Sequence, residues 1–366
     1  MRRIYLDYNA STPIDPAVAT AMRPFLEENF GNPSSGHWAS VGAKAALETA
    51  RGQVAALLGC HNDEIVFTSG GSEANNLALK GVFFKLRKKG DHIITTQIEH
   101  PAIVEPCRFL ERLGAQVTFL HVDGMGRVDP DDLRRAITPR TILVSIMHAN
   151  NEVGTIEPIE ECARIAHERG VLFHTDAAQS IGKIPTDVNR LGVDLLSIAG
   201  HKVYAPKGVG ALFVRRGVSL EPLIHGAGHE SGRRAGTESA LLAVGLGKAC
   251  ELARDLSPMD RVRELRDYFW MELQKRFGNR IALNGTRRTA CRTRSMFPSS
   301  SGSAPRYWRG STGSPPQRAR RVTPDASSSR PFWTRWASRP RWEWEPSASA
   351  SDAPRRAMKS TQWSGN

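Results

Sequence analysis

Residues 171–214 read VLFHTDAAQSIGKIPTDVNRLGVDLLSIAGHKVYAPKGVGALFV, and this stretch decides the fold. It holds three apolar segments with strand character, separated by polar or turn-forming residues. Similar segments lie upstream at 64–70, 92–97, 116–122 and 141–147, and amphipathic helical patterns lie at 40–58, 73–88, 101–113, 130–137 and 159–169. Alternating strands and helices predict an α/β fold, with a mainly parallel sheet between helices in a large domain.

Two further helical patterns, at 238–255 and 259–277, are expected to lead away from this sheet toward a smaller domain. The pattern predicts four parts along the chain. They are an N-terminal segment of the small domain (1–15), the large domain (16–255), the start of the small domain (256–286) and an anomalous tail (287–366). The smaller C-terminal domain would then be truncated or scrambled.

The tail differs from the rest of the chain in composition. Residues 287–366 contain no Leu or Ile, a single Val, nine Pro and six of the eight Trp residues. Such a segment cannot bury a normal core, which is typical of disorder, but disordered segments are usually poor in aromatic residues. We therefore favour a second hypothesis, that a frameshift in a GC-rich gene replaced the true C-terminal domain.

Charge and cysteine spacing narrow the classes of function. The tail carries +12 of the net charge of +13, so a nucleic-acid-binding function would depend on the tail alone. The five cysteines form no CxxC pair, which argues against a disulfide framework or a zinc site. No apolar run is long enough to span a membrane, and the N-terminus does not read as a signal peptide. We expect a cytoplasmic protein that binds no membrane and no metal.

Two charged residues follow predicted strands and can serve one cofactor. Lys202 lies at a strand end, where burial can lower the pKa of its amine enough for a Schiff base to form with an aldehyde. Asp176 follows the strand before it and can pair with a protonated pyridine nitrogen. Each alone is more simply a surface lysine or a turn residue; the pair at one sheet edge favours the cofactor site.

Three polar segments complete the predicted site. The helix start at Gly71 and Ser72 offers backbone N–H groups to a phosphate, although Ser72 and Glu73 also suit a capping box. His100 precedes a proline at a helix start, where it can stack on a ring, move protons or cap the helix. Asn150 and Asn151 end a strand and can bind a cofactor or a substrate.

These motifs together resemble one enzyme family. The segments YLDYNASTP (5–13), TSGGSEANN (68–76), EHPAI (99–103), MHANNEVGT (147–155), HTDAAQ (174–179), SIAGHKVYAPKGVG (197–210) and GRRAGTES (232–239) follow the order found in cysteine desulfurases. Those enzymes belong to the class V aminotransferase group of fold type I enzymes, which depend on pyridoxal 5′-phosphate (PLP). The resemblance covers about residues 4–285.

The resemblance implies a role for each matching residue. Lys202 would hold PLP and, with His100, act in catalysis, while Asp176 would pair with the ring nitrogen. Gln179 would contact the ring oxygen, Asn151 would face substrate and cofactor, and Gly71, Ser72 and His201 would bind the phosphate. Thr237 would reach the phosphate of a neighbouring subunit, which implies a homodimer. The substrate would be L-cysteine, and sulfur would pass to an acceptor protein for iron–sulfur clusters or tRNA thiolation.

The chain departs from the family pattern at three places. Ala199 stands where many relatives have a serine that binds the phosphate. The family's Ser-Gly-Ser-Ala-Cys loop, which carries the sulfur-accepting cysteine, has no match, since the similar letters at 299–305 end in Pro305. The arginine motif that holds the substrate carboxylate is absent as well. We therefore expect impaired sulfur transfer, and a selenocysteine lyase or another class V reaction is the alternative.

Overall fold

A computed structural model describes residues 3–285 and residue 291 of the chain. Seven strands form one sheet in the order β1-β7-β6-β5-β4-β2-β3. Their bounds are β1 Ile65–Thr68, β2 His92–Thr96, β3 Gln116–Leu120, β4 Thr141–Ser145, β5 Leu172–Asp176, β6 Leu195–Ala199 and β7 Gly210–Val214. Only β7 runs antiparallel to its neighbours, β1 and β6. The predicted α/β fold with a mainly parallel sheet is confirmed.

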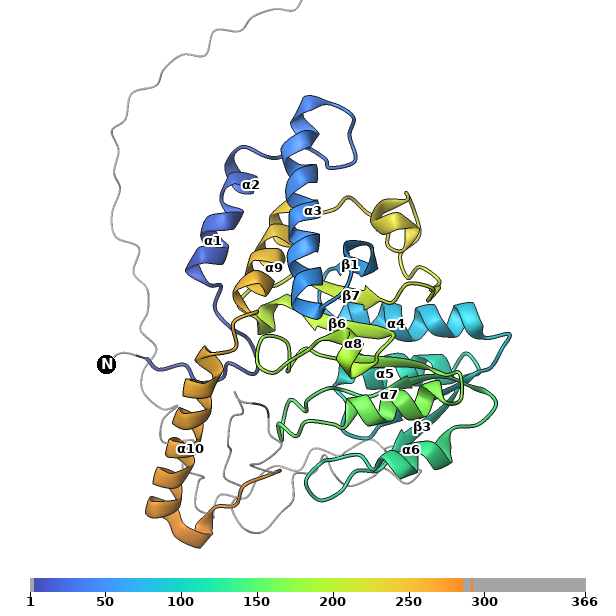
Figure 1. Cartoon of the computed structure of the whole chain (residues 1–366), viewed down its shortest axis with the longest axis vertical. Coiled ribbons are helices and arrows are strands. Elements are labelled where there is room, and N and C mark those ends of the chain that lie inside the picture. Colours follow the sequence, from blue (N-terminus) through green and yellow to red (C-terminus); the bar gives the residue numbers. More distant parts are fainter. Residues whose placement is uncertain (1–2, 286–290, 292–366) are drawn as a thin grey trace, which may run out of the picture. The chain divides into compact units, whose positions relative to one another are not determined.

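The central strands are buried on both faces, which explains their continuous apolar sequences. Every residue of β4, β6 and β7 is buried, whereas the edge strand β3 is buried only at Leu120. Parallel strands need covered faces because their crossover helices pack there. The chain supplies these helices between successive strands, as the alternation of patterns predicted (Figure 1).

Helices cover both sides of the sheet. In chain order they are α1 Pro16–Met22, α2 Pro24–Glu27, α3 Trp38–Leu58, α4 Gly71–Leu86, α5 Pro101–Glu111, α6 Pro130–Ala136, α7 Ile159–His167, α8 Val188–Leu191, α9 Ala240–Leu252 and α10 Pro258–Phe277. One core cluster joins α4 and α5 to the sheet, and a larger one joins α1, α3, α7, α8 and α9 to the other side. Figure 1 shows α1, α3 and α9 side by side.

One expectation about the last helices is wrong. The pattern at 238–255 was expected to lead away from the sheet, but α9 packs against α3 and α1. The larger core cluster includes three residues of α9, namely Ala243, Leu246 and Cys250. Small side chains such as that of Ala243 let this helix approach α3 closely. By contrast, α10 buries only Trp270. The predicted domain boundaries at 15, 255 and 286 stay predictions, and the tail lies outside the described residues except for Cys291.

Local sequence signals set several helix ends. Asp15 and Asp129 accept hydrogen bonds from first-turn N–H groups of α1 and α6, each followed by a proline at the first helical position. Gly59 ends α3 in the left-handed conformation, with a φ of 72°. Within residues 3–285, no helix is long and apolar enough to cross a membrane.

Candidate active site

A cavity of about 890 Å³ lies where the chain leaves the strands β1, β2, β4, β5 and β6. These five strands point the same way, so the segments after them meet at one edge of the sheet. Most of the predicted site residues line this cavity: Gly71, Ser72, His100, Asn151, Asp176, Gln179, His201 and Lys202. Residues that are up to 131 positions apart in the sequence therefore surround one space.

Lys202 ends the short 3₁₀ helix η2 (Gly200–Lys202) that follows β6. Its Nζ donates to the backbone oxygens of Asn9 and Ala10, the second at 3.0 Å. Burial lowers the pKa of Lys202, and the negative charges of Asp176 and Asp7 act against that change. A lowered pKa increases the fraction of free amine, which is the form that attacks an aldehyde.

Asp176 ends β5, lines the cavity and is buried. Its carboxylate accepts a hydrogen bond from Asn75 Nδ2 at 2.7 Å and one from the Ala178 N–H at 2.9 Å. Two donors hold the carboxylate in one orientation. The group is therefore placed and oriented to pair with a positively charged ring nitrogen in the cavity.

The start of α4 offers backbone donors to an anion. Gly70 precedes the helix with a φ of 150°, which favours glycine, and no side chain caps the first turn. A Cβ at Gly71 would come within 3.0 Å of the Ala199 Cβ, so glycine also lets the helix start approach β6. Glu73 accepts from the Ser69 N–H at 2.6 Å, so the carboxylate does not occupy the cavity-side N–H groups of Gly71 and Ser72.

His100 is the N-cap of α5, and its Nδ1 accepts a hydrogen bond from the Ala102 N–H at 3.1 Å. The ring also lines the cavity. The two interpretations of this histidine are therefore compatible, since Nδ1 caps the helix and Nε2 remains for a ligand. Because Nδ1 accepts, the neutral ring carries its proton on Nε2.

Neighbouring asparagines divide into a structural and a cavity-facing residue. Asn150 is buried: its Nδ2 donates to the Ile98 oxygen at 2.9 Å, and its Oδ1 accepts from the N–H groups of Glu152 and Val153 at 2.8 Å. These bonds shape the turn after β4 and leave Asn150 no capacity for a ligand. Asn151 lines the cavity.

The N-terminal segment forms a wall of the cavity that the sequence analysis did not predict. Gln179 Nε2 donates to the Asn9 oxygen at 3.1 Å, and His201 Nδ1 lies 3.3 Å from Ser11 Oγ. The Thr12 N–H donates to the His201 oxygen at 2.9 Å. The motif YLDYNASTP marked this segment, but its contacts with Gln179 and Lys202 use backbone oxygens, which no residue type reveals.

Thr237 is the one predicted site residue that does not line the cavity, and it is exposed. The loop before it is fixed to the rest of the site. Arg234 donates to Glu73 at 2.8 Å, and Glu230 pairs with the buried Arg51. Because Thr237 faces outward, its predicted role toward a neighbouring subunit stays a prediction.

None of the five cysteines lines the cavity, and all five belong to the described residues. Burial raises the pKa of Cys60, Cys107, Cys162 and Cys250 to about 12. Thiols with such values carry almost no thiolate near neutral pH. Cys291 is buried too, and its Sγ lies 3.4 Å from the Gln179 backbone oxygen. Cys60, Cys107, Cys162 and Cys250 therefore have structural surroundings, whereas Cys291 contacts a residue of the cavity lining.

The donor set suits a flat, phosphorylated aldehyde such as PLP. An amine, a carboxylate and an uncapped helix start surround one cavity, and glycine keeps side-chain bulk away from the helix start. An imidazole and an amide complete the wall. Among the described residues, no group of His, Cys, Asp and Glu is arranged to hold a metal ion.

Comparison with known proteins agrees with this chemistry. The model of the class V aminotransferase family matches residues 4–297. The cysteine desulfurase IscS of Dictyoglomus turgidum is 55% identical over 290 residues, which cover 78% of this chain and 73% of the relative. IscS of Clostridium botulinum, strain Kyoto, is 49% identical over 286 residues, covering 78% and 72%.

Solved structures of related proteins superpose on this chain as well. A NifS-like protein superposes with a TM-score of 0.77 at 39% identity, covering 80% of each chain. A protein described as SspA in complex with cysteine superposes with a TM-score of 0.71 at 40% identity, covering 78% of this chain and 82% of the other. In both comparisons about a fifth of this chain is unmatched.

Proposed function

The chain belongs to the class V aminotransferase family, in its cysteine desulfurase group, and we propose that it binds PLP through Lys202 and uses L-cysteine as substrate. The observation that carries the proposal is the meeting of Lys202, Asp176 and the start of α4 around one cavity. These groups supply the three interactions that such a cofactor needs: an amine for its aldehyde, a carboxylate for its ring nitrogen and donors for its phosphate.

Each residue has a separate task in this proposal. When bound, PLP draws electrons from the amino acid attached to it. Asp176 keeps the ring nitrogen protonated, which strengthens that effect. The N–H groups of Gly71 and Ser72, together with His201, hold the phosphate. Gln179 Nε2 donates one hydrogen to the Asn9 oxygen, and its second N–H would serve the ring oxygen. The Lys202 amine, once free, and the Nε2 of His100 are placed to move protons.

Absorption spectroscopy tests the cofactor assignment. The purified protein should be yellow with one PLP per chain, and Lys202→Ala should remove the cofactor's absorption maximum because the covalent attachment is lost. Lys80→Ala is the matched control, because Lys80 packs over the Phe109 ring and does not line the cavity. A wild-type protein that stays colourless with added PLP would contradict the proposal.

We further propose that this chain is impaired in sulfur transfer. The family's cysteine loop has no counterpart in the sequence, and none of the five cysteines of the chain lines the cavity. A desulfurase needs a thiolate that attacks the substrate sulfur, and the buried thiols with raised pKa values do not meet that need.

Two measurements test the impairment. With L-cysteine, alanine release should stay well below one equivalent per chain, because no protein thiolate takes the sulfur, and Cys291→Ser should behave like the wild type. Release of one equivalent or more that is lost in Cys291→Ser would instead make Cys291 the sulfur acceptor. Translating the gene beyond codon 285 in the other two frames should reveal an aliphatic pattern and a loop ending in cysteine; its absence from both frames would reject the frameshift.

The same observation favours one alternative reaction. A cavity that no cysteine lines suits a substrate whose sulfur or selenium leaves without attack by a protein thiol. We therefore consider selenocysteine as the substrate. Alanine release from selenocysteine, measured beside release from cysteine, distinguishes the two. Faster release from selenocysteine would favour a selenocysteine lyase over a desulfurase.

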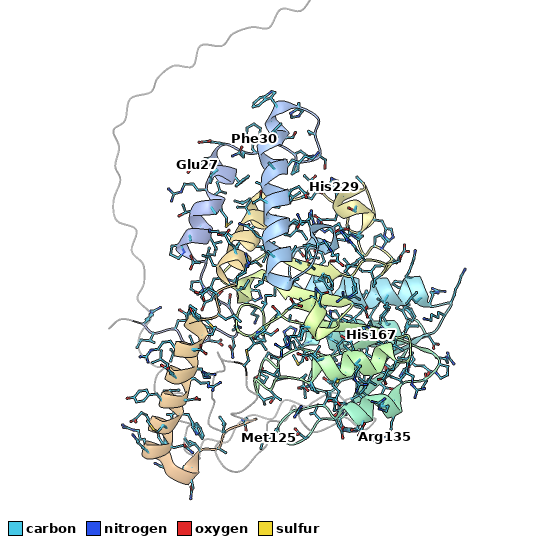
Figure 2. The ribbon with its side chains drawn as sticks, in the orientation of Figure 1. Glu27, Phe30, Met125, Arg135, His167 and His229 are labelled. Carbon is cyan, nitrogen blue, oxygen red and sulfur yellow. The ribbon has the colours of Figure 1, made fainter. Side chains whose placement is uncertain are left out.

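We also propose that the protein is a homodimer. Leu26, Phe30, Trp38 and Val41 are each exposed by 65% or more, and they lie on α2, the start of α3 and the segment between them. Figure 2 labels Phe30, which lies in the segment after α2. Large exposed apolar side chains in one region mark an interaction surface. Sedimentation should give a dimer that Phe30→Glu weakens; a monomeric wild type would contradict this.

A further inference from the structure

Glu99 lies directly before His100, in the turn between β2 and α5, and it is 7% exposed. Its Oε1 accepts two hydrogen bonds, from Thr96 Oγ1 at 2.7 Å and from the Met147 N–H at 2.9 Å. Thr96 ends β2, and Met147 follows β4. One carboxyl oxygen therefore joins the ends of two neighbouring strands at the cavity edge.

A second bond joins the same two segments. Asn150 Nδ2, from the turn after β4, donates to the Ile98 oxygen at 2.9 Å. The segment 97–100 carries His100, and the segment 147–153 carries Asn151. Both of those residues line the cavity, whereas Glu99 itself does not. Glu99 can thus affect the cavity through the residues that it holds.

We propose that Glu99 is a positioning residue, whose carboxyl group fixes the segment carrying His100 to the segment carrying Asn151. This inference rests on the proposed function, in which His100 moves a proton at the substrate. A group that moves a proton must keep its distance to the reacting atom within a few tenths of an ångström to remain effective. The two hydrogen bonds of Glu99, which join the ends of β2 and β4, provide that constraint.

The surroundings of Glu99 favour its uncharged form. Burial raises the pKa of Glu99 to about 8, and the charges of Asp176 and Glu157 act in the same direction. The other carboxyl oxygen, Oε2, is buried and has no hydrogen-bond partner among the described residues. A neutral acid is far less costly to bury than a carboxylate. It still presents a carbonyl oxygen that accepts both bonds, and the amide oxygen of glutamine would do the same.

The experiment uses the full-length protein loaded with PLP and follows exchange of the Cα hydrogen of L-alanine in D2O by NMR. In this reaction the Cα–H bond breaks, the proton goes to solvent through the protein base, and a deuteron from solvent takes its place. No thiol is needed. Glu99→Ala should slow the exchange by at least about tenfold because His100 is no longer held. Glu99→Gln should stay within about twofold of the wild type, since both bonds remain.

Separate readouts keep the outcomes distinct. PLP content and visible circular dichroism report whether cofactor binding survives, and the Glu99→Ala variant should retain full content with a changed dichroic band. Glu99→Asp should be slowed as well, because its shorter side chain cannot reach both Thr96 Oγ1 and the Met147 N–H. This variant replaces Glu99→Ala if the alanine variant does not fold. Glu64→Ala is the matched control: Glu64 is another buried carboxyl group, which accepts from the Arg216 N–H at 2.8 Å outside the cavity lining.

The positioning role is overturned if Glu99→Ala and Glu99→Asp both exchange alanine at the wild-type rate, or if Glu99→Gln is as slow as Glu99→Ala. The second result would mean that the acid itself takes part in the proton transfer. Neither result affects the proposed function, which fails only if the wild-type protein binds no PLP.

Discussion

At the scale of single residues, Ala199 is the position where a small change should strengthen the site. It ends β6 and lines the cavity beside Gly71. Its methyl group cannot donate a hydrogen bond to a phosphate held at the start of α4. A hydroxyl group at this position would face the same space.

We predict that Ala199→Ser tightens PLP binding. One added hydrogen bond to a charged group contributes about 1 kcal/mol, or roughly a fivefold lower dissociation constant. Absorbance titration of the cofactor-free protein measures it. Ser197→Ala on the same strand is the comparison, because Ser197 is buried against His174 Nε2 at 3.0 Å and does not line the cavity. Equal or weaker binding by Ala199→Ser would show that the hydroxyl does not reach the phosphate.

The residues that sequence analysis located share one property. Lys202, Asp176 and His100 each follow a strand, and the carboxyl ends of parallel strands meet at one edge, so pattern and position together predicted their meeting. The contributions of Asn9 and Glu99 were not predicted. Asn9 acts through its backbone oxygen, and Glu99 acts through a hydrogen bond across two strands, so neither depends on a local pattern.

At the scale of elements, a buried ion pair connects α3, β1 and the loop before Thr237. Arg51 of α3 pairs with Glu230 through two hydrogen bonds of 2.8 and 3.0 Å. Arg51 also donates to the Ile65 oxygen, and Glu230 accepts from the Phe67 N–H at 3.0 Å. Both side chains are nearly buried. Each charge therefore has an opposite charge beside it, and most polar atoms of the pair have a hydrogen-bond partner within the protein.

We predict that Arg51→Met lowers the free energy of unfolding by about 3 kcal/mol, because it leaves the Glu230 carboxylate buried without its partner. The double variant Arg51→Met with Glu230→Gln should cost less than the sum of the two single changes. Urea unfolding of all four proteins measures the coupling. As a control, Arg261→Met breaks an exposed helical pair with Glu264 and should change stability by less than about 0.5 kcal/mol. Additive single effects would mean that the pair does not act as a unit.

Most elements were predictable because their patterns are local. The five helical patterns before residue 170 and the seven apolar segments correspond to α3 to α7 and to β1 to β7. The antiparallel direction of β7 was not predicted, since a strand sequence does not state its direction. The packing of α9 was missed because small residues such as Ala243 and Gly247 give weak periodicity, although they allow close contact with α3.

At the scale of the whole molecule, folding keeps several ionisable groups uncharged. Burial lowers the pKa of His148 to about 4 and of His174 to about 3, while it raises the pKa of Glu157 to about 7. The histidines make the folded state less stable on acidification below about pH 6.5, since the unfolded chain then binds more protons. The buried acids have the opposite effect.

The difference in stability between the wild type and a Glu157 variant isolates the effect of one buried acid. The unfolded Glu157 releases its proton near its ordinary pKa of about 4.5, whereas the folded protein keeps it until about pH 7. We predict that the wild type loses stability relative to Glu157→Gln as the pH rises from about 4.5 to 7, with no further change above about pH 8. Thermal unfolding of both proteins across that range measures it. A constant difference would indicate that Glu157 ionises equally in both states.

Amino-acid composition also distinguished the part of the chain whose sequence resembles the family from the part whose sequence does not. Residues 1–286 have a net charge of +1, and the loss of aliphatic residues after 286 marked a change that no local motif could explain. Structural detail of that later part lies outside the described residues. Its sequence, which lacks the family's cysteine loop, supports the proposal of impaired sulfur transfer.

The place of β7 in the sheet has a consequence for biosynthesis. β1 pairs only with β7, which follows it by more than 140 residues, and the helix start that would hold the phosphate comes directly after β1. A ribosome must therefore finish residue 214 before the nascent polypeptide can complete this part of the site. Until then β1 has no neighbouring strand to protect its edge, so a chaperone that shields exposed strands would be of most use during the synthesis of the first two hundred residues.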